Sequence, residues 1–325
     1  GTPCGSGFID RRPDADGSGA MIRYIFTLLT LLLPAVSWAQ WTNEPAGSVT
    51  VADCAFSDST FCNAQKGGLA LNRFFDYYNS AAYEADAGDT ISPSGTINAI
   101  LPYTGPCSNG GSSFLACANG GMHFGYITAA PQREIFVGTN IWINPGYGCN
   151  LVGSSKWMFV RDLDNPAGFT PTNGVFLIRG CGATKQIIFS HNAGNHDNSH
   201  TCATDLGLTC FPNVGPGTIV EGQWAKIEVC LRSSSSLTSR DGIVKWWVNG
   251  VLAGSYTNFN YGNGNVNEVI YQQTWDGFGN GQGHSTTIRQ RFGHLHISIP
   301  PSGGCASGSG GGSIDNPIGP PGTTT

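Results

Sequence analysis

Short runs in which apolar and polar residues alternate recur along the chain from residue 133 to residue 299. Alternation with a period of two places successive side chains on opposite faces of a strand. We therefore expect strands, divided by Gly, Asn, Pro and Ser, at residues 133–144, 156–162, 174–180, 185–191, 223–232, 241–250, 251–259, 267–275 and 292–299. The best helix signal lies within residues 64–83 and predicts at most one short helix.

The order of these elements indicates the fold class. Strands do not alternate with helices, so a parallel α/β sheet is not expected. The 47 glycines suit many tight turns between short strands. The sequence therefore predicts an all-β domain in which two antiparallel sheets pack as a jelly-roll sandwich.

The adjacent tryptophans of the segment DGIVKWWVNG are assigned to opposite faces by the period of two. Trp246 shares the apolar face with Val244 and Val248, so it belongs to the core between the sheets. Trp247 falls on the second face, with the polar positions of the neighbouring strands. That second face carries Glu228, Arg232, Lys245, Trp247, His294 and His296.

If those strands are neighbours, the second face suits a sugar. A pyranose ring stacks its C–H face on indole, and charged groups direct hydrogen bonds to hydroxyls and carboxylates. We expect Trp247 to stack the ring and Lys245, Glu228 and Arg232 to make polar contacts, with His296, Gln273 and Trp275 as further binding residues. The alternative is a solvated sheet face with one half-buried tryptophan.

The ends of the chain differ from the middle in composition. Residues 21–39 combine one Arg, an apolar run and a small-x-small site, as in a secretory signal peptide, so residues 1–20 are interpreted as a non-native upstream extension. Residues 301–325 are rich in Gly, Ser and Pro and are expected to form a linker or tail, with a possible further domain beyond it. The jelly roll is assigned to residues 40–300.

The net charge and the cysteines indicate which partners and which compartment to expect. The net charge of −5 argues against nucleic-acid and membrane-surface partners. Ten cysteines follow the predicted signal peptide, without any CxxC pair, which favours disulfides and export over a zinc ribbon. Their connectivity stays open, with Cys54–Cys62, Cys107–Cys117 and Cys202–Cys210 as the pairs we favour. We expect a secreted protein, extracellular or periplasmic.

Four stretches resemble the concanavalin A-like lectin/glucanase superfamily, in particular its polysaccharide-lyase-like and laminin-G-like jelly rolls. They are WTNEPAG with SPSGTINAILPYTG, REIFVGTNIWINPGY with SSKWMFVRD, GQWAKIEVCLR with DGIVKWWVNGVLAGSYTN, and YQQTWDGFGNG with HLHIS. The resemblance spans residues 40–300 and implies the fold. It does not imply an activity, because the superfamily contains lyases, hydrolases, lectins and adhesion modules.

The lyase branch of this resemblance implies a definite chemistry. Such lyases neutralise a uronate carboxylate with Arg, Gln, Asn or His, and Tyr or His then removes the C5 proton. By this resemblance Arg289 or Arg291 would hold the uronate, and His294 or Tyr271 would act as the base. The familiar lyase signature strands are not found in this sequence.

Other motifs carry less weight. Glu84, Asp86 and Asp89 lie in EADAGD, which departs from the E-x-D-x-x-E strand of jelly-roll glucanases. The loops at 191–200 and 276–283 have compositions that leave calcium open as a cofactor, although no metal site is predicted. No nucleophile elbow, Walker loop or Rossmann glycine pattern occurs.

The sequence thus predicts a secreted jelly roll that binds an extracellular polysaccharide on one sheet face. The first alternative is a polysaccharide lyase that cleaves a uronate polymer by β-elimination. The second alternative is a structural or adhesive surface module, in which the same face would contact protein.

Overall fold

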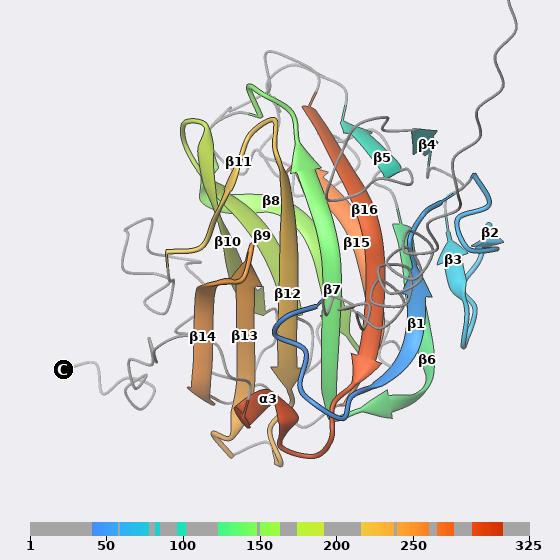
Figure 1. Ribbon diagram of the computed structural model, residues 1–325, viewed down its shortest axis with the longest axis vertical. Helices are drawn as coiled ribbons and strands as arrows, with labels where there is room; N and C mark the ends of the chain where they lie inside the picture. Colours follow the sequence, from blue (N-terminus) through green and yellow to red (C-terminus); the bar gives the residue numbers. More distant parts are fainter. Residues whose placement is uncertain are drawn as a thin grey trace, which may run out of the picture. The chain divides into compact units, whose positions relative to one another are not determined.

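A computed structural model describes residues 41–57, 59–77, 82–84, 96–101, 123–147, 150–162, 174–191, 216–236, 239–259, 265–275 and 288–307. Within these residues two eight-stranded sheets pack face to face (Figure 1), as the alternating pattern predicts. Every neighbouring pair of strands is antiparallel except β2 with β3. The predicted two-sheet sandwich is confirmed.

Sheet A has the order β14-β13-β12-β7-β16-β5-β4, and β1 also pairs with β16. It consists of β1 (Val49–Cys54), β4 (Ala82–Glu84), β5 (Thr96–Leu101), β7 (Glu134–Ile143), β12 (Trp224–Arg232), β13 (Gly242–Val248), β14 (Val251–Phe259) and β16 (Ile288–Ile299).

Sheet B has the order β11-β10-β9-β8-β15-β6-β3-β2. It consists of β2 (Gln65–Lys66), β3 (Phe74–Asp76), β6 (His123–Gln132), β8 (Asn150–Arg161), β9 (Gly174–Gly180), β10 (Thr184–His191), β11 (Thr218–Val220) and β15 (Val266–Trp275). A single turn of helix, α3 (Gly304–Ser307), follows β16.

The main core fills the space between the sheets with the apolar side chains of alternate strand positions. Its largest fully buried members include Phe124, Trp157, Phe176, Trp246 and Tyr271. Burial of one face of every strand is what fixes the register of both sheets, because a slip by one residue would turn each strand over. Each sheet therefore has a defined outer face.

Two predictions about the ends of the domain are corrected. The described residues between 64 and 83 contain β2, β3 and the start of β4 and no helix, in keeping with the two early glycines of that segment. Residues 301–307, expected to be part of a flexible tail, pack on sheet A, because Cys305 is fully buried and bonded to Cys230. The described helices include none long and apolar enough to cross a membrane.

The disulfides are partly as expected. Cys54–Cys62 is present, as predicted. Cys230–Cys305, which joins residues 75 apart in the sequence, was not predicted. The suggested pairs Cys107–Cys117 and Cys202–Cys210 lie outside the described residues.

Candidate functional site

The two adjacent tryptophans point to opposite faces of β13, as the period of two predicts. Trp246 is fully buried between the sheets, and its Nε1 donates to the Ile187 carbonyl at 2.8 Å. Gly254 on β14 makes room for this indole, because a Cβ there would overlap the ring. Trp247 lies on the outer face of sheet A, where it is nevertheless only 1% exposed.

Trp247 is covered by a second, smaller apolar cluster on the outer face of sheet A. The cluster contains Trp41, Phe136, Cys230, Ile243, Trp247 and Cys305. Figure 1 shows the two covering segments in front of sheet A: the chain that leads into β1, and α3 at its lower end. The prediction that Trp247 is open to a sugar ring is therefore wrong, because both ends of the domain fold over it.

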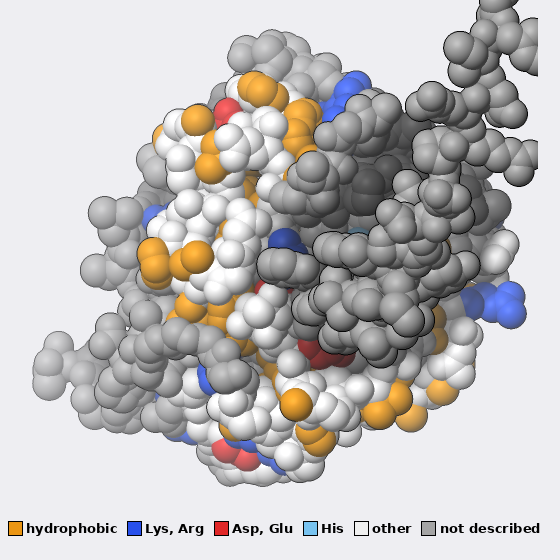
Figure 2. Space-filling model, viewed as in Figure 1, with side chains coloured by type: hydrophobic (Ala, Val, Ile, Leu, Met, Phe, Trp, Pro, Cys, Tyr) orange, Lys and Arg blue, Asp and Glu red, His pale blue; other side chains and the backbone are white. Residues whose placement is uncertain are grey.

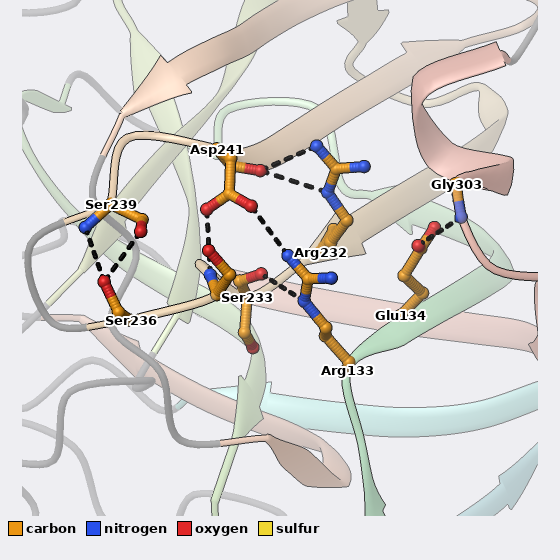
Figure 3. A network of polar contacts seen from close by, with 9 residues as sticks. Arg133, Glu134, Arg232, Ser233, Ser236, Ser239, Asp241 and Gly303 are labelled. Atoms are coloured by element: carbon orange, nitrogen blue, oxygen red, sulfur yellow. Dashed lines mark hydrogen bonds and ion pairs between the residues drawn. The ribbon is translucent and has the colours of Figure 1, made fainter.

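The C-terminal cover is fastened by polar contacts as well as by its disulfide. The Glu134 carboxylate accepts a hydrogen bond from the backbone N–H of Gly303 at 2.6 Å (Figure 3). It accepts a second one from the backbone N–H of Cys305 at 3.0 Å. Lys245 donates to the Ala306 carbonyl at 3.2 Å. Lys245 is thus engaged in holding α3, which is a structural role.

Arg232 is engaged in a network at the end of the same sheet. Its Nε and Nη2 donate to the Asp241 carbonyl oxygen at 3.0 and 2.7 Å, and Arg133 forms an ion pair with the Asp241 carboxylate at 2.8 Å (Figure 3). The bond from Ser235 N–H and the Arg133 charge lower the pKa of Asp241, although burial opposes them. Arg232 therefore holds the β12–β13 connection, which differs from the predicted contact with a sugar.

The N-terminal cover is centred on Glu228. This carboxylate is fully buried and accepts hydrogen bonds from the backbone N–H and the side-chain amide of Asn43, each at 2.8 Å. Trp41 lies against Gly138, where any Cβ would overlap its ring. Glu228 therefore anchors residues 41–44 and is not open to a ligand.

His294 and His296 lie beside that cover and share one carboxylate. His294 Nε2 and His296 Nδ1 lie 2.8 and 2.9 Å from the same Asp53 oxygen, and His296 Nε2 lies 3.2 Å from Glu44. The Trp41 ring stacks on His296 at 5.7 Å and meets His294 edge-on at 5.3 Å. This group of side chains, called the histidine clamp below, ties β1 and β16 to the N-terminal cover.

The contacts within the histidine clamp favour the charged forms of Asp53 and His296. Burial alone would raise the pKa of Asp53, but its hydrogen bonds to the two histidines hold that pKa well below its usual range. Burial would lower the pKa of His296, but its bonds to Asp53 and Glu44 raise it above its usual value. Both nitrogens of His296 are occupied, so its role is structural.

The remaining predicted residues are distributed over different surfaces. Tyr271 faces the sandwich interior, where it bonds Thr139 and donates to the His294 carbonyl at 3.0 Å, and burial raises its pKa, so it is not placed to act as a base. Gln273 is fully buried, and neither atom of its amide has a hydrogen-bond partner.

Arg289 and Arg291 lie on β16 and are partly exposed. Trp275 ends β15, and its side chain lies outside the described residues.

The strand order separates residues that the sequence placed together. Between β13 and β16 lie β12 and β7, so Lys245 and His294 are three strand spacings apart, about 14 Å. Where the described residues are visible on this face in Figure 2, apolar side chains are scattered and charged ones are few. The predicted continuous sugar-binding face is therefore divided, and its lower half is closed.

The outer face of sheet B carries a row of polar side chains that the sequence analysis did not single out. His123 on β6 is paired with Gln272 on β15, Lys156 on β8 with Leu177 on β9, and Arg179 on β9 with Gln186 on β10. These positions alternate with core residues, so they share the outer face. The row of His123, Gln272, Lys156, Arg179 and Gln186 is called the polar band below.

His123 has the most perturbed environment in the polar band. Burial and the positive charge of Arg161 together lower its pKa to about 4, against the opposing effect of Asp76. The exposed ring of Tyr77 lies 6.2 Å from the imidazole. Asp76 is itself buried and paired with Lys66 at 2.7 Å. His123 is therefore neutral at neutral pH.

The polar band borders an apolar patch on the same outer face. The patch consists of the buried side chains of Phe75, Ile127, Phe159, Val175, Leu177, Ile188 and Ile270. Beyond it, Arg161 forms an ion pair with the buried carboxylate of Glu268. The outer face of sheet B thus has a dry centre flanked by hydrogen-bonding groups, with Gln272 Oε1 left without a partner.

The period of two could have identified these residues. Residues 156–162 and 267–275 were predicted as strands, but only the late strands of sheet A were divided into faces. The period of two places the side chain of Gln272 on the opposite face of its strand from those of Tyr271 and Gln273. His123 lies in β6, which was not predicted.

Metal binding is not supported by the described part of the chain, where no group of three or more His, Cys, Asp or Glu side chains is arranged to hold an ion. The loops at 191–200 and 276–283, considered for calcium, lie outside the described residues apart from His191. Of the residues in EADAGD, Asp86 and Asp89 lie outside them as well.

No family model and no curated protein matches this chain. Solved structures do match its fold. The PL-14 alginate lyase from Aplysia kurodai has a TM-score of 0.50 at 9% identity, covering 78% of this chain and 100% of that one. Alginate lyase Aly36B with an alginate tetrasaccharide has a TM-score of 0.46 at 12% identity, covering 78% and 96%. Endo-β-1,4-glucuronan lyase from the fungus Trichoderma reesei has a TM-score of 0.41 at 11% identity, covering 68% and 88%.

These similarities place the chain in the concanavalin A-like jelly-roll fold. At such identities they are similarities of fold, and the chemistry has to be argued from this chain's own side chains.

Proposed function

We propose that this protein is a secreted polysaccharide lyase, which cleaves a uronate polymer by β-elimination on the outer face of sheet B. The observation that carries the proposal is His123, a histidine held neutral by its surroundings, paired in register with the amide of Gln272. The similarity of fold to the PL-14 alginate lyase supports this reaction class over glycoside hydrolysis.

The polar band contains the groups that β-elimination needs. The reaction removes the proton at C5 of a uronate, forms a C4–C5 double bond and breaks the bond from C4 to the glycosidic oxygen. Gln272, the register partner of His123, and Lys156 on the next strand would hold the carboxylate, so that negative charge developing next to it is stabilised. The proton passes from C5 to the neutral imidazole of His123, and the leaving oxygen takes a proton from the resulting imidazolium.

The electrostatics favour this assignment over the predicted base His294. A base must be deprotonated at the working pH, and the lowered pKa of His123 ensures that state. His294 is bonded to Asp53 and lies beneath Trp41. The ring of Tyr77 places a phenolic group near the imidazole of His123.

The test is an assay of the full chain on alginate, glucuronan, pectin and glycosaminoglycans, followed through the ultraviolet absorbance of the unsaturated product. We expect cleavage of at least one uronate polymer and a loss of about 10²–10⁴-fold in kcat for His123→Gln. The matched control is Gln223→Ala, an exposed residue next to β12 of the other sheet, which should cleave like the wild type. Silence on every polymer, or an unchanged rate in His123→Gln, contradicts the proposal.

Binding without cleavage is the second candidate function. The same polar band would hold an acidic sugar without transferring a proton. Retardation in gels that contain a uronate polymer, together with silence in the absorbance assay, would favour this candidate.

A further inference from the structure

A second row of side chains, on the opposite sheet, combines aromatic and cationic groups. Trp224 on β12 is the register partner of Trp142 on β7, and Trp142 is also the register partner of Arg291 on β16. Figure 1 shows β12, β7 and β16 side by side in sheet A. All three side chains point to the outer face, and all are partly exposed. Trp224, Trp142 and Arg291 are called the aromatic strip below.

The strip lies beyond the region that the N-terminal cover closes. Trp41 lies over Gly138, which is paired with Glu228 and His296. Trp142 is four residues further along β7, about 13 Å away. Thus the same outer face that buries Trp247 at one end leaves aromatic side chains partly exposed at the other.

Arg291 is positioned by its neighbour. Its guanidinium carbon lies 4.4 Å from the centre of the Trp142 ring, a stacked cation–π arrangement. Stacking restricts the plane of the guanidinium, whose N–H groups are suited to a carboxylate. Less conformational entropy is then lost when an acid binds.

The surroundings of the strip favour an anion. The next row consists of Lys226, Asn140 and His294, with Asn140 as the register partner of the other two. No residue of either row is acidic. The carboxylates nearest to them are paired: Asp53 lies 2.8 Å from His294, and the buried Glu228 accepts hydrogen bonds from Asn43 and lies 3.8 Å from Lys226. An indole beside a fixed guanidinium suits a sugar ring that carries a carboxylate.

We infer that the aromatic strip is a second glycan-binding site, which holds a uronic acid residue of a polysaccharide away from the polar band. Trp224 contacts the C–H face of the ring, and Arg291 binds its carboxylate. The inference rests on the proposed function for the class of glycan, but it does not need the protein to be catalytic. Such a site would keep a polymer attached while the polar band acts on another part of it.

The test is affinity electrophoresis of the full chain in gels containing alginate or glucuronan, with a neutral β-glucan gel for comparison. In a His123→Gln background, where cleavage is removed, Trp224→Ala and Arg291→Ala should each weaken retardation by roughly tenfold. Arg291→Lys should restore part of the binding to the acidic polymer, because it retains the charge but not the fork. Arg291→Ala and Arg291→Lys should leave retardation in the neutral gel unchanged, because a neutral glucan has no carboxylate for Arg291 to bind.

The two proposals fail in different ways. If the wild type is retarded and Trp224→Ala is not, while no polymer is cleaved, the strip is a binding site and the lyase proposal fails. If Trp224→Ala and Arg291→Ala, with unchanged melting temperatures, are retarded like their parent, the inference is overturned. It is also overturned if Trp224→Ala lowers kcat on a trisaccharide as much as on polymer, since the strip would then belong to the reaction site.

Discussion

The outer faces of both sheets follow from the same alternation of apolar and polar residues, but the two faces differ in what covers them. On sheet A, Trp247 and Glu228 are sealed by residues 41–44 and by the turn that carries Cys305. On sheet B, the polar band borders a dry patch, and His123 is kept neutral within it. The difference shows that a period of two identifies a face, whereas the segments that cover it decide what the face can do.

The same contrast occurs within sheet A. Trp224 and Glu228 lie on one face of β12, four residues apart, yet Trp224 is partly exposed and Glu228 is fully buried. One end of that face is covered by residues 41–44 and 303–306, whereas the side chains at the other end are partly exposed. Three substitutions test this division, from the largest expected effect to the smallest.

Removal of the sealed tryptophan should have the largest effect on stability. Trp247→Ala would leave a cavity among Trp41, Phe136 and the Cys230–Cys305 bridge, and should cost about 3–5 kcal/mol of unfolding free energy. Trp224→Ala is the matched control and should cost far less. Chemical denaturation measures both, and similar values for the two variants would mean that Trp247 is not sealed.

Loss of the C-terminal bridge should come next. Cys305→Ser would free the turn that caps Trp247 and should lower the unfolding free energy by about 2–5 kcal/mol. It should also increase the accessibility of Trp247, seen as a red shift and stronger quenching of tryptophan fluorescence. A variant that unfolds at the wild-type denaturant concentration would show that the cover contributes little.

The histidine clamp should give a smaller, pH-dependent effect. The pKa of His296 is raised on folding, so its contribution is complete below about 6.5 and is lost as the pH rises through its folded pKa. The pKa of Asp53 is lowered, so its contribution is present above about 3.8 and is lost as the pH falls toward its folded pKa. The stability difference between the wild type and Asp53→Asn should therefore be largest between those values.

The comparison of the wild type with Asp53→Asn also separates the clamp's contribution to pH-dependent stability from that of His123 on the other sheet. His123, whose pKa is lowered to about 4, makes the fold less stable as the pH falls from about 6.5 toward 4, and this effect is common to both proteins. Thermal melting across the pH range measures the difference. A difference that does not shrink above pH 6.5 would contradict the clamp.

The parts of this structure that follow from periodicity could be predicted. The expected strands from 133 to 299 are present within a few residues, and the opposed directions of Trp246 and Trp247 follow from the alternation. The strand order could not be predicted, because alternation does not specify which strands are neighbours. The assumption that β13 and β16 lie together was wrong for that reason.

The covers could not be predicted either. Residues 41–44 and 303–306 have no periodic pattern, and the composition of the second segment is that of a linker. Their packing depends on single contacts over long sequence separations, such as Asn43 with Glu228 and Cys305 with Cys230. By contrast, Gln272 and Trp224 could have been assigned to their outer faces from the alternation alone.

The most direct test of the central claim is to find which face a short uronate oligosaccharide protects. Hydrogen exchange of the full-length Trp224→Ala variant, in which the aromatic strip is weakened, can be compared with and without the oligosaccharide. The account predicts slower exchange in peptides covering β6 and β15, which carry His123 and Gln272. Protection confined to β7, β12 and β16, with none in sheet B, would contradict it.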